Sequence, residues 1–306
     1  MSMKTRKMTL FLLVILFCVT TVFFSTGAAG AKLKKWERKK IELEKDLYYY
    51  PRELHENDES IDKHSLDIYY PENSKDRPVM VFIHGGSWSY GDRSWYRLLG
   101  YTFAKQGIVT VIISYRLAPD YIYPAQIEDT VHAVNYVFNN ISKYGGNPEF
   151  IYLCGHSAGA HIVSSIIFND KFREQLSFEH QKLNGLILIS GPFLISEEFI
   201  VKEKYSKTVE KVFTENKEVW DDASPFNHVK KIDIPIFIAY AENDWLLAKF
   251  QSKIFQKKLI DSGCNSEIKE IKTKNHYSEI VFMQLPEDEM HKEVLNFINT
   301  HLKSGE

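Results

Sequence analysis

The sequence predicts an α/β fold in which a largely parallel sheet is covered by helices on both faces. Apolar runs of strand length alternate with segments of helical periodicity through most of the chain. Two glycine-containing turns each follow one of these apolar runs directly. Alternation at this spacing is typical of parallel sheets, whose ligands bind at the carboxyl ends of the strands.

Each expected element has its own signal. Continuous or alternating apolar runs predict the strands, and apolar residues spaced three and four apart predict the helices. The expected strands are residues 66–70, 79–84, 108–114, 150–154, 183–189, 234–239 and 266–271. The expected helices are residues 128–144, 159–168, 246–259 and 290–302. Residues 193–219 interrupt the alternation, and we expect them to form a small helical lid over the sheet.

Composition and charge narrow the class of protein. The chain has 306 residues, of which 44% are hydrophobic and 25% charged, and its formal net charge is −2. These values are ordinary for a globular protein, and no basic stripe of the kind that nucleic-acid binding needs is visible. The three cysteines do not make a disulfide framework. Cys154 lies in an apolar run, where a buried thiol is expected, and a Cys154–Cys264 bridge is the alternative.

The N-terminal segment has the pattern of a membrane anchor. Basic residues at positions 4, 6 and 7 precede an uncharged stretch over residues 8–31, and six Lys and Arg residues follow it within residues 32–40. About 20 such residues cross a bilayer, so we expect a single-pass anchor in the endoplasmic reticulum or secretory pathway. The alternative is a signal peptide cleaved near Ala29-Gly30-Ala31, which would give a secreted protein. Basic flanks on both sides leave the orientation open.

Three regions follow from these patterns. Residues 1–31 form the anchor or signal peptide, and residues 32–58 form a charged lead-in segment. The spacing of Trp36, Ile41, Leu43 and Leu47 predicts an amphipathic helix within that segment. We expect residues 59–306 to form the α/β domain.

A nucleophilic serine is predicted at residue 157. The run Gly155-His156-Ser157-Ala158-Gly159 follows an expected strand and opens an expected helix. A sharp strand-to-helix turn lifts the serine hydroxyl clear of the sheet, and the flanking glycines permit close backbone contacts. The five-residue pattern is weak by itself, but its position between a strand and a helix makes an incidental serine a poor explanation. This arrangement is typical of the α/β-hydrolase fold.

A second glycine turn supplies the expected oxyanion hole. His84-Gly85-Gly86-Ser87-Trp88 follows the strand at residues 79–84. Backbone N–H groups near Gly85 and Gly86, together with that of Ala158, can donate hydrogen bonds to a tetrahedral intermediate. We expect His84 to orient this turn. The nearby Trp88, Tyr90 and Trp95 either line the substrate pocket or pack in the interior.

The order of the remaining residues selects the acid and the base. In this fold the acid follows the serine along the chain and the histidine comes last. His276 lies in a loop between a strand and the last helix, whereas His291 and His301 lie within that helix. Asp244 stands just past the strand at residues 234–239 and is the expected acid, with Glu242 as the alternative. The predicted triad is therefore Ser157, Asp244 and His276.

Several matched segments resemble the hormone-sensitive-lipase-like esterases of the α/β-hydrolase superfamily. They include residues 66–71, 84–88, 91–93, 115–119, 124–129, 144–148 and 155–160. Residues 151–162 and 276–286 are similar to prenylcysteine methylesterases, which are membrane-associated and cleave the C-terminal methyl ester of prenylated proteins. Arylformamidases share the His84–Trp88 turn and the triad order. Two departures are Ser87, where many members have a third glycine, and Gln126, where the lipase-like branch often has alanine.

The sequence thus predicts a serine carboxylic-ester hydrolase that acts through an acyl-enzyme, with a prenylcysteine methyl ester as the favoured substrate. An arylformamidase-type amide hydrolase and a general carboxylesterase are the alternatives. A peptidase fits less well, because no large appended domain is present to gate the site. A non-catalytic scaffold is disfavoured because every triad residue is present. We expect no cofactor and no metal, a small-molecule ester or amide substrate, and contact with a membrane through the N-terminal segment.

Overall fold

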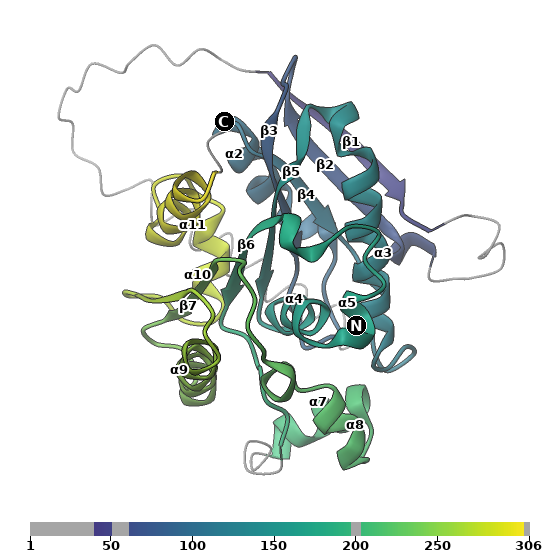
Figure 1. Cartoon of the computed structure of the whole chain (residues 1–306), viewed down its shortest axis with the longest axis vertical. Coiled ribbons are helices and arrows are strands. Elements are labelled where there is room, and N and C mark those ends of the chain that lie inside the picture. Colours follow the sequence, from purple (N-terminus) through teal and green to yellow (C-terminus); the bar gives the residue numbers. More distant parts are fainter. Residues whose placement is uncertain (1–39, 51–60, 197–202, 303–306) are drawn as a thin grey trace, which may run out of the picture. The chain divides into compact units, whose positions relative to one another are not determined.

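A mixed eight-stranded sheet lies at the centre of the computed structural model, which describes residues 40–50, 61–196 and 203–302 (Figure 1). These residues belong to one compact unit, Lys39–Glu306. The strand order is β1-β2-β4-β3-β5-β6-β7-β8; the pairs β1/β2 and β2/β4 are antiparallel and the other pairs are parallel. The predicted α/β-hydrolase architecture is confirmed.

The strands are β1 (Ile41–Tyr48), β2 (Ser65–Pro71), β3 (Arg77–Ile83), β4 (Val109–Ile113), β5 (Gly146–His156), β6 (Leu183–Ile189), β7 (Ile236–Ala241) and β8 (Ser266–Ile271). The α-helices are α2 (Arg97–Lys105), α3 (Ala125–Asn140), α4 (Ala158–Phe168), α5 (Asp170–Arg173), α7 (Glu203–Phe213), α8 (Lys217–Asp222), α9 (Leu246–Asp261), α10 (Ser278–Met283) and α11 (Glu289–Thr300).

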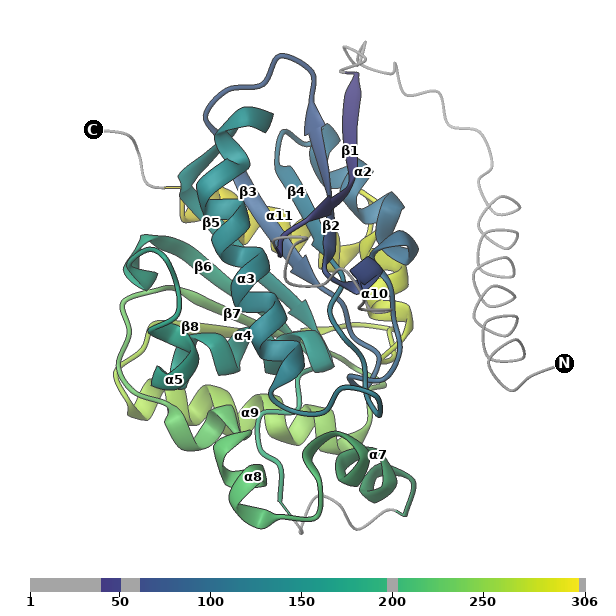
Figure 2. The same ribbon diagram turned by 90° about the vertical axis from the view of Figure 1, so that its right-hand side faces the viewer.

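Helices cover both faces of the sheet. Alternate residues of each strand point to opposite faces, and two separate apolar cores result. One core joins the sheet to α3, α4 and α9, and the other joins it to α2, α10 and α11. Figures 1 and 2 show α3 and α4 on the opposite side of the sheet from α11. Because both faces are covered, the central parallel strands β3, β4, β6 and β7 consist of nearly continuous apolar residues, whereas β8 at the edge also contains several charged residues.

The lead-in segment contains strand β1, so the amphipathic helix that the sequence predicted there is wrong. Residues 41–48 pair antiparallel with β2, with Ile41 opposite Pro71 and Tyr48 opposite Ser65. The alternation of Ile41 and Leu43 fits the two-residue period of a strand as well as the residues fit a helical period. Pairing with β2 makes the segment a strand. Charged residues between them are typical of an edge strand, because they oppose pairing with another chain. The folded unit therefore includes residues that we assigned to the segment preceding the catalytic domain.

The register of β3 and β5 brings two turns together. Ile83 lies opposite Gly155 in this parallel pair. The turn that follows β3 therefore begins beside the turn that follows β5. Helix α4 also approaches the sheet closely, since a Cβ atom at Gly159 would lie 2.0 Å from the Ile83 carbonyl oxygen. Only glycine at this position allows that approach, and it fixes the start of α4 at the edge of the sheet.

The segment predicted as a lid contains α7 and α8. Residues 197–202 within it lie outside the described part of the chain, as does the whole of the predicted anchor in residues 1–31. Tyr123 donates a backbone hydrogen bond to the carbonyl oxygen of Val212 in α7, and Phe213 packs against Trp88. No helix among the described residues is both long and apolar enough to span a bilayer.

We predict that removing β1 destabilises the domain. A chain that starts at residue 60 loses the strand and Tyr49, whose buried ring packs in the core. Loss of a buried aromatic side chain costs about 3 kcal/mol or more. For a domain of this size the melting temperature should fall by at least about 6 °C relative to a chain that starts at residue 40. Equal melting temperatures, measured by calorimetry, would show that β1 is not part of the cooperative unit.

Candidate active site

Ser157 lies in the sharp turn between β5 and α4. Its backbone has φ of 54° and ψ of −119°, a left-handed conformation that is rare for a residue with a side chain. Its N–H donates a 2.8 Å hydrogen bond to the carbonyl oxygen of Ile189 at the end of β6. A Cβ atom at Gly155 would lie 2.4 Å from the backbone of Gly159. The two glycines therefore allow the tight turn that presents the serine hydroxyl.

The structure brings together the three side chains that the sequence selected for the triad. Nε2 of His276 lies 3.0 Å from the hydroxyl oxygen of Ser157, and Nδ1 lies 3.0 Å from Oδ1 of Asp244. His276 stands in the loop between β8 and α10, and Asp244 in the loop between β7 and α9. Both are buried. Hydrogen bonds thus connect the serine, the imidazole and the carboxylate in series.

Asp244, and not Glu242, contacts the histidine. Glu242 is directed to the surface, where its carboxylate pairs with Lys272 at 3.3 Å and accepts a 2.9 Å hydrogen bond from the Thr273 N–H. The sequence could not separate these two acids by position alone. The structure separates them because the chain turns between the two residues, so that only one side chain faces the sheet edge.

Two neighbours hold the Asp244 carboxylate in place. The Ser190 hydroxyl donates a 2.6 Å hydrogen bond to Oδ2, and the Trp245 N–H donates a 2.7 Å hydrogen bond to Oδ1. Burial opposes ionisation of this carboxyl, but the hydrogen bonds from His276, Ser190 and Trp245 outweigh it and lower its pKa below the ordinary value. The carboxylate is therefore ionised near neutral pH. Our sequence analysis missed Ser190, although its place just past β6 was a usable signal.

The turn after β3 lies against the serine. A Cβ atom at Gly85 would lie 3.1 Å from the Ser157 Cβ and 2.9 Å from the His156 carbonyl oxygen. Gly86 has φ of +126°, and Ser87 and Trp88 also have positive φ values. Ala158 begins α4, where backbone N–H groups favour negative charge. Of the predicted oxyanion-hole residues, Gly85 thus lies against Ser157, and Ala158 follows the serine at the start of α4.

His84 holds this turn, as expected. Its Nδ1–H donates a 2.8 Å hydrogen bond to the Gly85 carbonyl oxygen, and its ring stacks on Tyr115. The Tyr115 hydroxyl in turn donates to the His84 carbonyl oxygen at 2.8 Å. Burial lowers the pKa of His84 to about 4. The imidazole is therefore neutral near pH 7 and acts as a fixed part of the turn.

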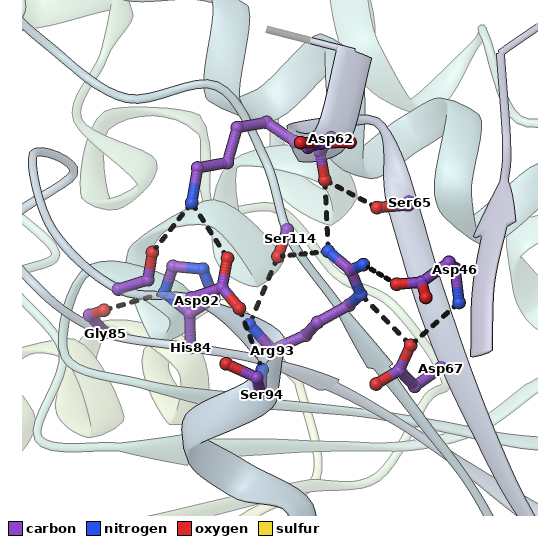
Figure 3. A network of polar contacts seen from close by, with 12 residues as sticks. Asp46, Asp62, Ser65, Asp67, His84, Gly85, Asp92, Arg93, Ser94 and Ser114 are labelled. Carbon is purple, nitrogen blue, oxygen red and sulfur yellow. Dashed lines mark hydrogen bonds and ion pairs between the residues drawn. The ribbon is translucent and has the colours of Figure 1, made fainter. Parts of the chain in front are cut away.

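A charged network supports the residues that follow the turn (Figure 3). Lys63 pairs with Asp92 at 2.9 Å and donates to the Gly91 carbonyl oxygen. Arg93 donates to Asp67 of β2 at 3.0 Å and also pairs with Asp46 of β1. A Cβ atom at Gly91 would lie 2.3 Å from Nδ1 of His84, so this network packs directly behind the oxyanion turn.

Trp88 is a packing residue and not part of an exposed pocket wall. Its ring is buried, and its Nε1–H donates a 3.2 Å hydrogen bond to Nδ1 of His161 in α4. Nε2–H of His161 donates to the Ala223 carbonyl oxygen at 2.7 Å. Tyr90 and Trp95 are instead exposed. The tryptophan therefore connects the oxyanion turn to α4 and to the segment that carries α7.

Two further titratable residues lie behind the histidine, and the sequence analysis did not select them. Nε2 of His156 lies 3.0 Å from the His276 carbonyl oxygen and 3.2 Å from Oε1 of the fully buried Glu279. Among the described residues, His156, His276 and Glu279 are close enough together to consider as metal ligands. A carbonyl oxygen only accepts, so Nε2 of His156 carries a proton and offers no lone pair to a metal. These residues form a hydrogen-bonded group.

Comparison with known proteins gives one matching family model and several relatives. The family model described as BD-FAE matches residues 66–259, which contain two of the three triad residues. A probable isoprenylcysteine alpha-carbonyl methylesterase of Arabidopsis thaliana, ICMEL2, is 28% identical over an alignment of 257 positions that covers 78% of this chain and 60% of that protein. Kynurenine formamidase of Danio rerio is 26% identical over 70% of each chain. The predicted resemblance to methylesterases and formamidases is confirmed.

The chain spans about 60% of the length of the plant methylesterases that it matches. Among solved structures, esterase B from Lactobacillus rhamnosis superposes with a TM-score of 0.72 at 20% identity over 95% of both chains. An esterase from Pyrobaculum calidifontis superposes with a TM-score of 0.73 at 18% identity, over 99% of this chain and 95% of that chain. These likenesses establish the fold.

We predict that Asp244→Asn lowers kcat/KM by about 10³- to 10⁴-fold, because the amide no longer fixes the imidazole tautomer or stabilises its positive form. Glu242→Gln is the matched control, since it also neutralises a carboxylate in the same loop, and it should retain activity within about twofold of wild type. Steady-state ester hydrolysis measures both variants. The assignment of the acid is wrong if the two variants exchange these outcomes.

We also predict that the domain loses stability as pH falls from about 6.5 to 4. Burial lowers the pKa of His84 and of His161 to about 4, well below the 6.5 expected in the unfolded chain. In this window the unfolded state binds more protons, so the free energy of unfolding falls by up to about 3 kcal/mol for each histidine.

His161→Gln tests this pH dependence. Glutamine can keep both hydrogen bonds of His161 and does not titrate, so the loss between pH 7 and pH 4 in urea denaturation should shrink by about 3 kcal/mol. An unchanged loss would show that His161 does not contribute to it.

Proposed function

Because this chain belongs to the BD-FAE family of α/β-hydrolase esterases, we propose that it is a serine carboxylesterase with Ser157 as its nucleophile. The observation that carries the proposal is the continuous hydrogen-bond series from Ser157 through His276 to Asp244. That series lies at the carboxyl ends of the parallel strands, where this class of sheet binds its ligands. The glycine turn that we propose as the oxyanion hole lies beside the serine.

The proposed reaction has two stages. His276 takes the hydroxyl proton as the Ser157 oxygen attacks the ester carbonyl, and Asp244 stabilises the imidazolium. N–H groups near Gly85, Gly86 and Ala158 stabilise the oxyanion. The tetrahedral intermediate collapses, the C–O bond to the alcohol breaks, and His276 returns its proton to the leaving alcohol. Water then loses a proton to His276 and attacks the acyl-enzyme. The bond between the acyl carbon and the Ser157 oxygen breaks, His276 returns its proton to that oxygen, and the acid leaves.

We further propose that the substrate carries a large apolar group and that prenylcysteine methyl esters are the preferred class. Exposed apolar side chains stand next to His276: Trp245 stacks on its ring with centroids 4.2 Å apart, and Tyr277 contacts the edge of both. Leu246 and Phe250 follow on α9, with 83% and 50% of their surface exposed. Exposed apolar clusters of this kind are common at binding sites. The similarity to isoprenylcysteine methylesterases supports the same substrate class.

A formamidase is the second candidate. Kynurenine formamidase of Danio rerio matches 70% of each chain, a more even coverage than that of the plant methylesterases. The triad geometry serves amide and ester cleavage alike, because both pass through the same tetrahedral intermediate. The nature of the group bound beside Trp245 would decide between them.

We predict that a fluorophosphonate probe labels the wild-type chain and not Ser157→Ala. Among substrates, kcat/KM for farnesylcysteine methyl ester should exceed that for N-formylkynurenine by at least about tenfold, because only the farnesyl chain covers the apolar side chains beside His276. Initial rates with each purified substrate give both values.

The two measurements test the serine-hydrolase assignment and the substrate class separately. Equal labelling of wild type and Ser157→Ala would contradict the serine-hydrolase assignment itself. A preference for N-formylkynurenine would favour the formamidase. Leu246→Ser should raise KM for the farnesyl substrate and leave the hydrolysis of a short acetyl ester within about twofold of wild type; an equal effect on both esters would contradict the role given to α9.

We also propose that residues 8–31 hold the enzyme at a membrane of the secretory pathway. The uncharged length of this segment and its basic flanks support the proposal. We predict that the full chain sediments with membranes after a carbonate wash, whereas residues 40–306 stay in the supernatant. Secretion of a shortened chain into the medium would instead indicate a cleaved signal peptide.

A further inference from the structure

The Glu279 carboxylate is an unusual group to find beside a catalytic imidazole. It is fully buried in the first turn of α10. Oε1 lies 3.2 Å from Nε2 of His156 and 3.9 Å from Nδ1 of His276. Oε2 has no hydrogen-bond partner among the described residues. Burying a carboxylate with so few partners costs free energy, so we looked for a role of Glu279 at this place.

The surrounding hydrogen bonds assign the protons. Nε2 of His156 faces the His276 carbonyl oxygen, which only accepts, so Nε2 carries a proton that it shares with Glu279. Nδ1 of His156 has no partner among the described residues and lies close to the Cα of Gly85. The hydrogen-bond geometry therefore places a hydrogen of His156 on Nε2.

Oε1 of Glu279 therefore faces two N–H groups. One is Nε2–H of His156, and the other is Nδ1–H of His276, which is donated to Asp244. A proton on Oε1 would oppose both N–H groups, so this oxygen acts as an acceptor. If the carboxyl is ionised, it accepts from His156 and attracts the Nδ1–H of His276. Two carboxylates thus face Nδ1 of His276. The nearest oxygen of Asp244 lies 3.0 Å from this nitrogen, and that of Glu279 lies 3.9 Å from it.

We propose that Glu279 is a positioning residue and a second carboxylate for His276: its charge stabilises the imidazolium that forms when Ser157 loses its proton. The same residue orients His156, which connects the His276 loop, the serine turn and the Gly85 turn. This inference rests on the proposed function, since it assigns Glu279 a part in the base's proton transfer.

An electrostatic role and a purely structural role of Glu279 predict different effects of its substitution on the pH dependence of activity. Removing a negative charge beside His276 makes the imidazolium less stable, so the base is protonated only at lower pH. The acidic limb of the pH profile of kcat/KM should then move to lower pH. A purely structural role would lower activity by the same factor at every pH and leave the limb in place.

The titratable groups that contact the His276 ring are few within the described residues. They are Ser157 from the start of α4, Asp244 from the loop before α9, His156 from β5, and Tyr277 and Glu279 from the α10 region. Trp245 covers the ring face without a charge. Of these groups, Asp244 and Glu279 are the carboxylates, so each can be removed in turn.

The test compares Glu279→Gln with wild type in the full chain solubilised in detergent, using p-nitrophenyl butyrate from pH 5 to 9. Glutamine keeps the length and an accepting oxygen but removes the charge. We expect the acidic limb to move down by about 0.5–1 pH unit and the plateau of kcat/KM to fall by about tenfold. Glu287→Gln is the matched control: its side chain is exposed and pairs with Lys292, so its profile should coincide with wild type.

Glu279→Met guards against a folding artefact, because it fills the same space without charge or polar atoms. If Glu279→Gln fails to fold, the Met variant is measured in its place, with its melting temperature as the check on folding; it should show the same limb displacement. Folded variants whose limb coincides with that of wild type would overturn the inference. Absence of hydrolysis and of fluorophosphonate labelling in wild type would instead contradict the proposed function.

Discussion

The left-handed backbone of Ser157 is the constraint on which the rest of the site depends. This conformation costs free energy for any residue with a side chain, and the surrounding packing has to hold it. Gly155 and Gly159 allow α4 to approach the sheet so closely that a Cβ atom at either residue would overlap the backbone. The hydrogen bond from Ser157 N–H to Ile189 fixes the turn from the other side. The serine hydroxyl is therefore placed by backbone contacts before any other side chain acts on it.

The partners of Ser157 come from distant parts of the chain and meet through sheet order. β3, β5, β6, β7 and β8 are consecutive and parallel, so their carboxyl ends share one edge. The oxyanion turn, the serine, Ser190, Asp244 and His276 each follow one of these strands. The polar groups of the triad have defined partners: Ser190 and the Trp245 amide hold Asp244, and the carboxylate holds the imidazole. Such satisfied buried networks are rigid, which suits a site that has to stabilise a transition state without rearrangement.

Much of this arrangement was predictable because it is local or periodic. The strands at 183–189 and 266–271 agree with the structure residue for residue, and the triad followed from chain order and strand ends. Strand β1 was missed because Leu43 and Leu47 also fit a helical spacing, and only pairing with β2 decides the matter. Helix α2 was not predicted, because we recognised no helical periodicity over its residues. The position of Ser190 just past β6 was a usable signal that we missed. The roles of His156 and Glu279 could not be predicted, because they depend on which buried atoms meet across the sheet edge.

If Ser157 is the nucleophile, it carries the acyl group of the substrate during turnover. Rapid quenching of the enzyme in acid during hydrolysis of a slowly deacylating p-nitrophenyl ester, followed by peptide mass spectrometry, detects this acyl group. We expect a mass increase equal to the acyl group on the peptide that contains Ser157, together with a burst of nitrophenol equal to the enzyme concentration. An acyl group on another residue, or turnover at the same rate by Ser157→Ala, would contradict this role of Ser157.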